Sequence, residues 1–140
     1  MKWELAVPWI LSLLTAALGI WQFSAQQSQA NRRPFLEQQL AIGVEITETA
    51  ARLATETDPV KWTEDRATFW RLYWGRLALV EDREVESSMV QMGELIPKGP
   101  ITANALPTSQ LEIPAYELSH AVRGLILESW NVDLPPLKGR

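Results

Sequence analysis

The chain has 140 residues, which is enough for one domain and not comfortably for two. Its 13 Lys and Arg residues against 17 Asp and Glu residues give a formal net charge of -4. This mild acidity argues against a nucleic-acid-binding protein, because such proteins carry a basic patch. The chain has no cysteine, which excludes disulfides, thiolate zinc sites and thiol nucleophiles.

An apolar stretch without any charge occupies residues 5–23. As a helix it would span roughly 28 Å, close to the ~30 Å hydrocarbon core of a bilayer. Trp3 and Trp21 would then lie at the two membrane interfaces, where Trp is enriched. We therefore expect a transmembrane anchor over residues 1–24. The alternative is a cleaved signal peptide, with residues 28–30 (Ser-Gln-Ala) as a small-x-small cleavage site.

A juxtamembrane segment over residues 25–33 is expected to follow the anchor. It ends in Arg32 and Arg33, which we interpret as membrane-interface anchors that reach lipid phosphates. Positive residues favour the cytoplasmic side, so the pair predicts a single-pass membrane protein with a cytoplasmic C-terminal part.

Small residues lie along one side of the predicted span. Ser12 and Ala16, and likewise Thr15 and Gly19, are four residues apart, and this spacing lets two helix backbones approach closely. We predict that these four residues pack on a partner helix. The alternative is that they are small by chance, since small residues are common in transmembrane helices.

Beyond residue 33 the apolar residues recur at three- and four-residue spacing, which predicts helices over residues 34–55, 59–80 and 83–96. Pro34 is expected to bend or restart the chain. Asp58-Pro59 is typical of a helix start, with Asp58 as N-cap. The expected fold is all-α: one N-terminal transmembrane helix followed by a small domain of three to four helices. We delimit the rest of the chain as a helical domain over 34–96, a Pro-rich linker over 97–114, a C-terminal helix over 115–131 and a tail over 132–140.

An aromatic cluster stands out in the middle of the chain, made of Phe69, Trp70, Tyr73 and Trp74. At helical spacing such a cluster is typical of a core. Trp and Tyr also concentrate where proteins bind one another, so partner docking stays open as a second interpretation. Gly75 follows the cluster and is interpreted as a point of close helix packing.

Three groups of polar side chains are candidates for chemistry. The carboxylates at residues 81, 82, 84 and 86 lack the spacing of a calcium loop, so a solvated helix junction is the better interpretation. Glu45 and Glu48 resemble half of a carboxylate metal motif, but the chain has only one His, His120. No phosphate-binding loop is found. We therefore predict no catalytic residues, no metal site, no cofactor and no enzymatic activity.

The sequence also resembles a loose family of uncharacterised bacterial proteins with a single membrane span and a small helical domain. The resemblance covers residues 5–96. It lies in the pattern FW-x-LYWG-x-L between Phe69 and Leu77, followed by VED from Val80 and by Val85 and Met89. It implies the same fold and brings no activity or site residues.

These observations favour a non-catalytic accessory or assembly subunit of a larger membrane protein complex. Its expected partners are membrane lipid and a transmembrane helix of the complex, and no nucleic acid. The alternative is a stand-alone, membrane-tethered homodimeric regulator that recruits a soluble partner.

Overall fold

The computed structural model describes residues 3–134, and within them it leaves out the side chains of residues 3–11, 13, 25, 28 and 29. No β-strand occurs among the described residues, so the all-α prediction is confirmed. The chain divides into two compact units, Met1–Glu37 and Gln38–Arg140. We refer to them as the N-terminal unit and the bundle unit.

The first helix, α1 (Trp3–Thr55), supplies the described structure of the N-terminal unit and continues into the bundle unit. In the part of the chain that the structure describes, no helix is long and apolar enough to cross a membrane. This finding contradicts the predicted transmembrane anchor, and with it the single-pass membrane location and the cytoplasmic side assigned to the rest of the chain. Among the residues whose side chains the structure describes, the apolar run of α1 extends from Leu14 to Phe23, which is roughly 15 Å of helix and about half of a bilayer core.

The interface roles predicted for Trp3, Trp21, Arg32 and Arg33 depended on that span and lose their basis with it. The Trp3 side chain lies outside the description, and Trp21 is exposed on α1. Arg33 donates to the Glu37 carboxylate at 2.9 Å, one turn further along the helix. The chain is also helical on both sides of Pro34, so the helix does not restart there as one of the two predicted outcomes required. Loss of one backbone donor is tolerated there because helix-compatible residues extend in both directions.

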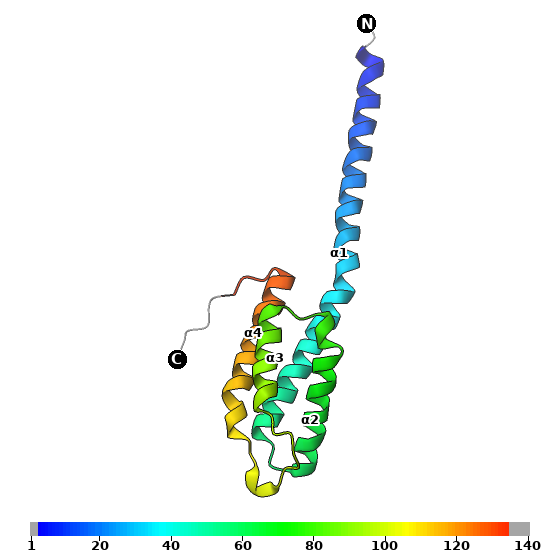
Figure 1. Ribbon diagram of the computed structural model, residues 1–140. Helices are drawn as coiled ribbons and strands as arrows, with labels where there is room; N and C mark the ends of the chain where they lie inside the picture. The colour runs from blue at the N-terminus through cyan, green and yellow to red at the C-terminus, as the bar shows by residue number, and fades with distance from the viewer. Residues whose placement is uncertain (1–2, 135–140) are drawn as a thin grey trace. The chain divides into compact units, whose positions relative to one another are not determined.

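Four α-helices make up the bundle unit (Figure 1). They are α1 from residue 38 onward, α2 (Pro59–Trp74), α3 (Arg83–Leu95) and α4 (Glu112–Trp130). Successive helices run in opposite directions (Figure 1). Short 3-10 helices, η1 (Leu77–Leu79), η2 (Ala103–Ala105) and η3 (Ser109–Leu111), lie in the connections. The predicted helix over 59–80 therefore ends early, at Trp74.

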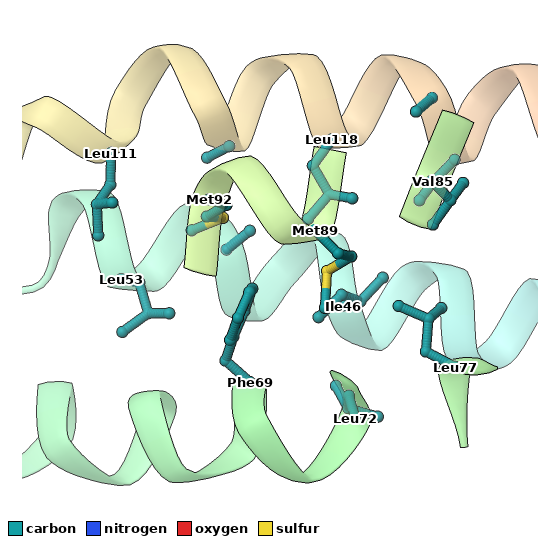
Figure 2. Close-up of a cluster of buried hydrophobic side chains, with 14 of the residues drawn as sticks. Ile46, Leu53, Phe69, Leu72, Leu77, Val85, Met89, Met92, Leu111 and Leu118 are labelled. Atoms are coloured by element: carbon teal, nitrogen blue, oxygen red, sulfur yellow. The ribbon is translucent and has the colours of Figure 1, made fainter. Parts of the chain in front are cut away.

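Side chains from all four helices form the core of the bundle (Figure 2). Ile46 and Leu53 come from α1, and they face Phe69 of α2 and Met89 of α3. Trp62 is also fully buried, and its indole N–H donates to the Leu53 carbonyl at 2.9 Å. The hydrogen bond matters because a buried N–H without a partner would offset part of the gain from burying the ring.

Local chemistry sets the start of α2 and α3. The Asp58 carboxylate accepts from the backbone N–H of Val60 at 2.8 Å, with Pro59 in the first turn, so the predicted N-cap is confirmed. Asp82 caps α3 in the same way through the backbone N–H of Val85 at 2.9 Å. These caps satisfy backbone donors that have no partner inside the helix.

Gly75 ends α2. A Cβ atom built at Gly75 would lie 2.8 Å from the backbone carbonyl oxygen of Arg71. The residue therefore permits a close approach of the chain to its own helix, rather than the contact between two helices that was expected. The close contacts between helices involve two other glycines. A Cβ at Gly43 would lie 2.9 Å from Val122 of α4, and a Cβ at Gly93 would lie 3.0 Å from the Trp70 ring.

Candidate docking surfaces

The aromatic cluster extends from the core to the surface along α2. Phe69 is fully buried, Trp70 and Tyr73 are half-buried, and Trp74 is 76 % exposed. The Trp70 ring packs edge-on against Phe69 with centroids 5.3 Å apart and lies nearly parallel to the Trp74 ring at 6.4 Å. The Tyr73 ring packs edge-on against both tryptophans, with its centroid 5.4 Å from that of Trp70 and 4.6 Å from that of Trp74. The two interpretations of the cluster therefore apply to different residues: Phe69 is core, and Trp74 is available to a partner.

Contact with α3 holds the middle of this aromatic cluster in place. The Trp70 ring lies over Gly93, where any side chain would crowd it. Trp70 and Tyr73 both contact the exposed Trp74 ring, and ring pairs of this kind favour defined geometries. Pre-positioned exposed Trp and Tyr side chains are typical of protein-binding surfaces.

The predicted helix-packing residues lie in the N-terminal unit. Ser12, Thr15, Ala16 and Gly19 are all exposed on α1. Nothing lies within 4 Å of a Cβ built at Gly19, so this side of the helix has room for a second backbone. Large apolar side chains of the same segment are exposed as well. They are 57 % to 71 % exposed, and they are Leu14, Leu18, Ile20, Trp21 and Phe23.

A groove that sequence patterns did not predict runs between α1 and α4 within the bundle unit. Its main hollow has a volume of about 310 Å³ and a mostly apolar lining that includes Gly43, Val44, Val122 and Ile126. The only signal in the sequence was Gly43 in the middle of a helical pattern. A Cβ at Gly43 would lie 2.9 Å from Val122 and 3.4 Å from Ile126, so the glycine lets the side chains of α4 come close to α1 at this hollow.

The polar groups considered for chemistry are engaged in local structure. Glu45 pairs with Arg76 at 3.0 Å, whereas Glu48 lies 3.9 Å from Arg52, so the two carboxylates interact with different cations. Among the described residues, no group of three or more His, Cys, Asp or Glu side chains could hold a metal ion.

The carboxylates that follow η1 behave as a helix junction. Asp82 is the cap of α3, and burial raises the pKa of the neighbouring Glu81 carboxyl. The charges of Glu86 and Asp82 raise it further, because they disfavour a third negative charge nearby. The carboxylates of this junction are therefore crowded, and Glu81 is the one whose pKa rises.

The His120 ring packs against the Tyr116 ring one turn earlier in α4, with centroids 4.1 Å apart and the ring planes tilted by 44°. The Ser119 hydroxyl donates to the Ala115 carbonyl at 2.8 Å, which directs it along its own helix. The adjacent Ser and His side chains are therefore each committed to a different contact within α4.

No family model, curated protein or solved structure matches this chain. The resemblance over residues 5–96 to uncharacterised bacterial proteins therefore stays a prediction, and the function has to be argued from the surfaces themselves.

Proposed function

We propose that the protein is a non-catalytic accessory or assembly subunit of a larger protein complex. The observation that carries this proposal is the apolar surface of α1 in the N-terminal unit. At 3.6 residues per turn, Leu14, Leu18 and Trp21 share an arc of roughly 60°, while Ile20 and Phe23 lie on the far side. A helix that is apolar on every side is typically buried inside a larger body.

Burial of this surface is energetically significant. Each large apolar side chain contributes about 1.5–3 kcal/mol when it moves from water to a fully apolar setting. Several such side chains together match the total stability of a small domain, about 5–15 kcal/mol. The N-terminal unit provides no second described element to cover them, so we infer that other subunits do.

The small residues determine which side of α1 a partner helix would contact in this proposal. Ala16 and Gly19 let a partner helix approach α1 closely, and the Ser12 and Thr15 side chains are short enough not to block it. Leu14, Leu18 and Trp21 on the opposite side then contact the surrounding apolar surface. In this proposal the bundle unit docks a second part of the complex through Trp74.

The test is quantitative co-purification. A chain tagged after residue 140 is isolated under mild conditions, and the molar ratio of each co-purifying protein is measured by mass spectrometry. We expect a stoichiometric partner, and we expect the double variant Ala16→Leu with Gly19→Leu to lower its yield about tenfold, since leucines block close helix approach. Ala17→Leu on the opposite side is the matched control. Equal recovery by all three proteins would refute the role of this helix.

A self-associating regulator is the second candidate, favoured by the open space at Gly19. The same small side that accommodates a partner helix also accommodates a second copy. The chain contains no cysteine, so Gly19→Cys introduces a unique cross-linking site. A disulfide-linked homodimer would favour the regulator, whereas a cross-link through a short maleimide–amine reagent to a larger protein would favour the assembly subunit.

A further inference from the structure

The groove between α1 and α4 continues beyond its main hollow. A second hollow of about 220 Å³ lies along the same two helices, and Ser119 lines both. Both linings are mostly apolar, and between Gly43 and Ala54 the groove follows α1 for roughly 16 Å. The main hollow, of about 310 Å³, is at the lower end of the range for small-molecule sites, about 300–1,000 Å³. The groove therefore has the size and the lining of a site for a slender apolar molecule.

Arg123 brings a positive charge to the main hollow. Its side chain is half-buried, yet among the residues that the structure describes its guanidinium has no ion pair and no hydrogen bond. Arg66 is the other half-buried arginine of the described chain, and it donates to the backbone carbonyls of Pro97 at 2.8 Å and Gly99 at 2.7 Å. A cation that is partly removed from water without an acceptor costs stability. A bound anion would supply the acceptor that Arg123 lacks.

The two hydroxyl groups of the main hollow are already engaged. The Thr47 hydroxyl donates to the Gly43 carbonyl at 3.0 Å, and the Ser119 hydroxyl donates to the Ala115 carbonyl at 2.8 Å. An extended peptide would need partners for its backbone N–H and C=O groups, which these hydroxyls do not provide. One turn of a peptide helix, about 10 Å wide, occupies roughly 420 Å³, which is more than the main hollow encloses. The groove therefore suits an occupant that is apolar along its length and anionic at one end.

We propose that this groove binds a long-chain fatty acid, with the carboxylate at Arg123 and the acyl chain running into the second hollow. Ala115, which lines the second hollow, lies eight residues before Arg123, roughly 12 Å along α4. Charge sets the orientation, because Glu112 lines the second hollow and would repel a carboxylate there. The site lies within the bundle unit, so it does not depend on the partner proposed for the N-terminal unit.

Isothermal titration calorimetry of the full chain with sodium decanoate, below its micelle concentration, tests the carboxylate position. We expect one-to-one binding that Arg123→Gln weakens at least tenfold, because the amide loses the charge that pairs with the carboxylate. Arg83→Gln is the matched control, since Arg83 lines a different hollow, between α3 and α4, and it should bind like the wild type. No binding by the wild-type chain, or equal affinities of the wild type and Arg123→Gln, would overturn the proposal. An equal loss in both variants would also overturn it, because it would indicate a general effect of charge.

The length of the acyl chain tests its path along the groove. Each methylene added between octanoate and dodecanoate should tighten binding about fourfold as it leaves water. Ala51→Phe fills the second hollow from α1 and should abolish this gain for the longer acids. Ala67→Phe, at an exposed alanine of α2, is the control and should keep it. The same gain in Ala51→Phe as in the wild type would place the acyl chain outside the groove and contradict the proposal.

Discussion

The two units of this chain use similar apolar residues in opposite ways. In the bundle unit, Ile46, Leu53 and Phe69 are fully buried against one another, whereas Leu18 and Trp21 of the N-terminal unit are exposed on the same kind of helix. The difference lies in their neighbours: the bundle unit contains three further helices, and the N-terminal unit has no second described element. The helical pattern and the apolar content of a segment therefore do not determine whether its side chains are buried. Burial depends on which other helices pack against the segment.

The largest expected effect comes from emptying the bundle core. Phe69→Ala should lower the free energy of unfolding by about 3–5 kcal/mol, because it removes a fully buried ring and leaves a cavity. Leu18→Ala in the N-terminal unit should leave that free energy unchanged. Urea unfolding followed by circular dichroism measures both. A comparable loss in Leu18→Ala would mean that the N-terminal unit contributes to the folded core.

Substitution of one glycine in each unit should give a stability difference of intermediate size. Gly75→Ala should destabilise the bundle by about 1–3 kcal/mol, since the new Cβ meets the Arg71 carbonyl, which belongs to a helix and cannot move aside cheaply. Gly19→Ala meets nothing within 4 Å and removes a poor helix former, so it should cause no loss. Thermal unfolding of the two variants distinguishes the sites, and a lower melting temperature for Gly19→Ala would show that its surroundings are occupied.

A smaller effect is expected from polar contacts at the helix ends. Asp58→Ala should cost about 0.5–2 kcal/mol, because two backbone donors at the start of α2 lose their acceptor. Arg33→Ala breaks an exposed ion pair in the N-terminal unit and should cost less than about 1 kcal/mol. The comparison requires chemical denaturation of both variants under one salt condition. An Asp58→Ala variant as stable as the wild type would mean that the capping bond adds nothing to the bundle.

The smallest expected effect is a dependence on pH in the bundle unit. The pKa of Glu81 is raised, mainly by burial, so the folded state holds its proton to a higher pH than the unfolded state does. Stability contributed by the protonated form is therefore lost as the pH rises through the folded-state pKa. Glu81→Gln should remove this decline and leave the variant slightly more stable than the wild type at neutral pH.

Glu56 provides the opposite case for this pH comparison. Backbone N–H groups of Asp58 and Thr57 lower its pKa, so its contribution is present above the unfolded-state pKa and is lost as the pH falls through the folded-state pKa. Glu56→Gln should therefore flatten the acidic side of the stability profile. Melting temperatures measured from pH 3 to pH 8 test both residues, and identical profiles for the two variants would contradict the assignment.

The helices could largely be predicted because their signals are local. The spacing of apolar residues and the Asp58-Pro59 start each act within a few residues of the backbone that they organise. The membrane span was predicted from the whole apolar stretch 5–23, whereas the described side chains of α1 include only its second half, Leu14 to Phe23. The prediction that the helix restarts at Pro34 was also based on a local signal. Proline removes one backbone hydrogen bond, and that loss does not end a helix that extends on both sides.

The sequence by itself determined that the chain is all-α, where α2 and α3 start, and that one stretch of aromatic residues shares a helix. Only the tertiary structure decided which of those aromatic residues are buried, since Phe69 lies in the core of the bundle while Trp74 is 76 % exposed. It also decided that Gly43 permits a close contact between α1 and α4, whereas Gly75 permits a close approach of the chain to its own helix. The physical reason is that capping and periodicity depend on neighbours along the chain, whereas burial and grooves depend on contacts between residues far apart in sequence.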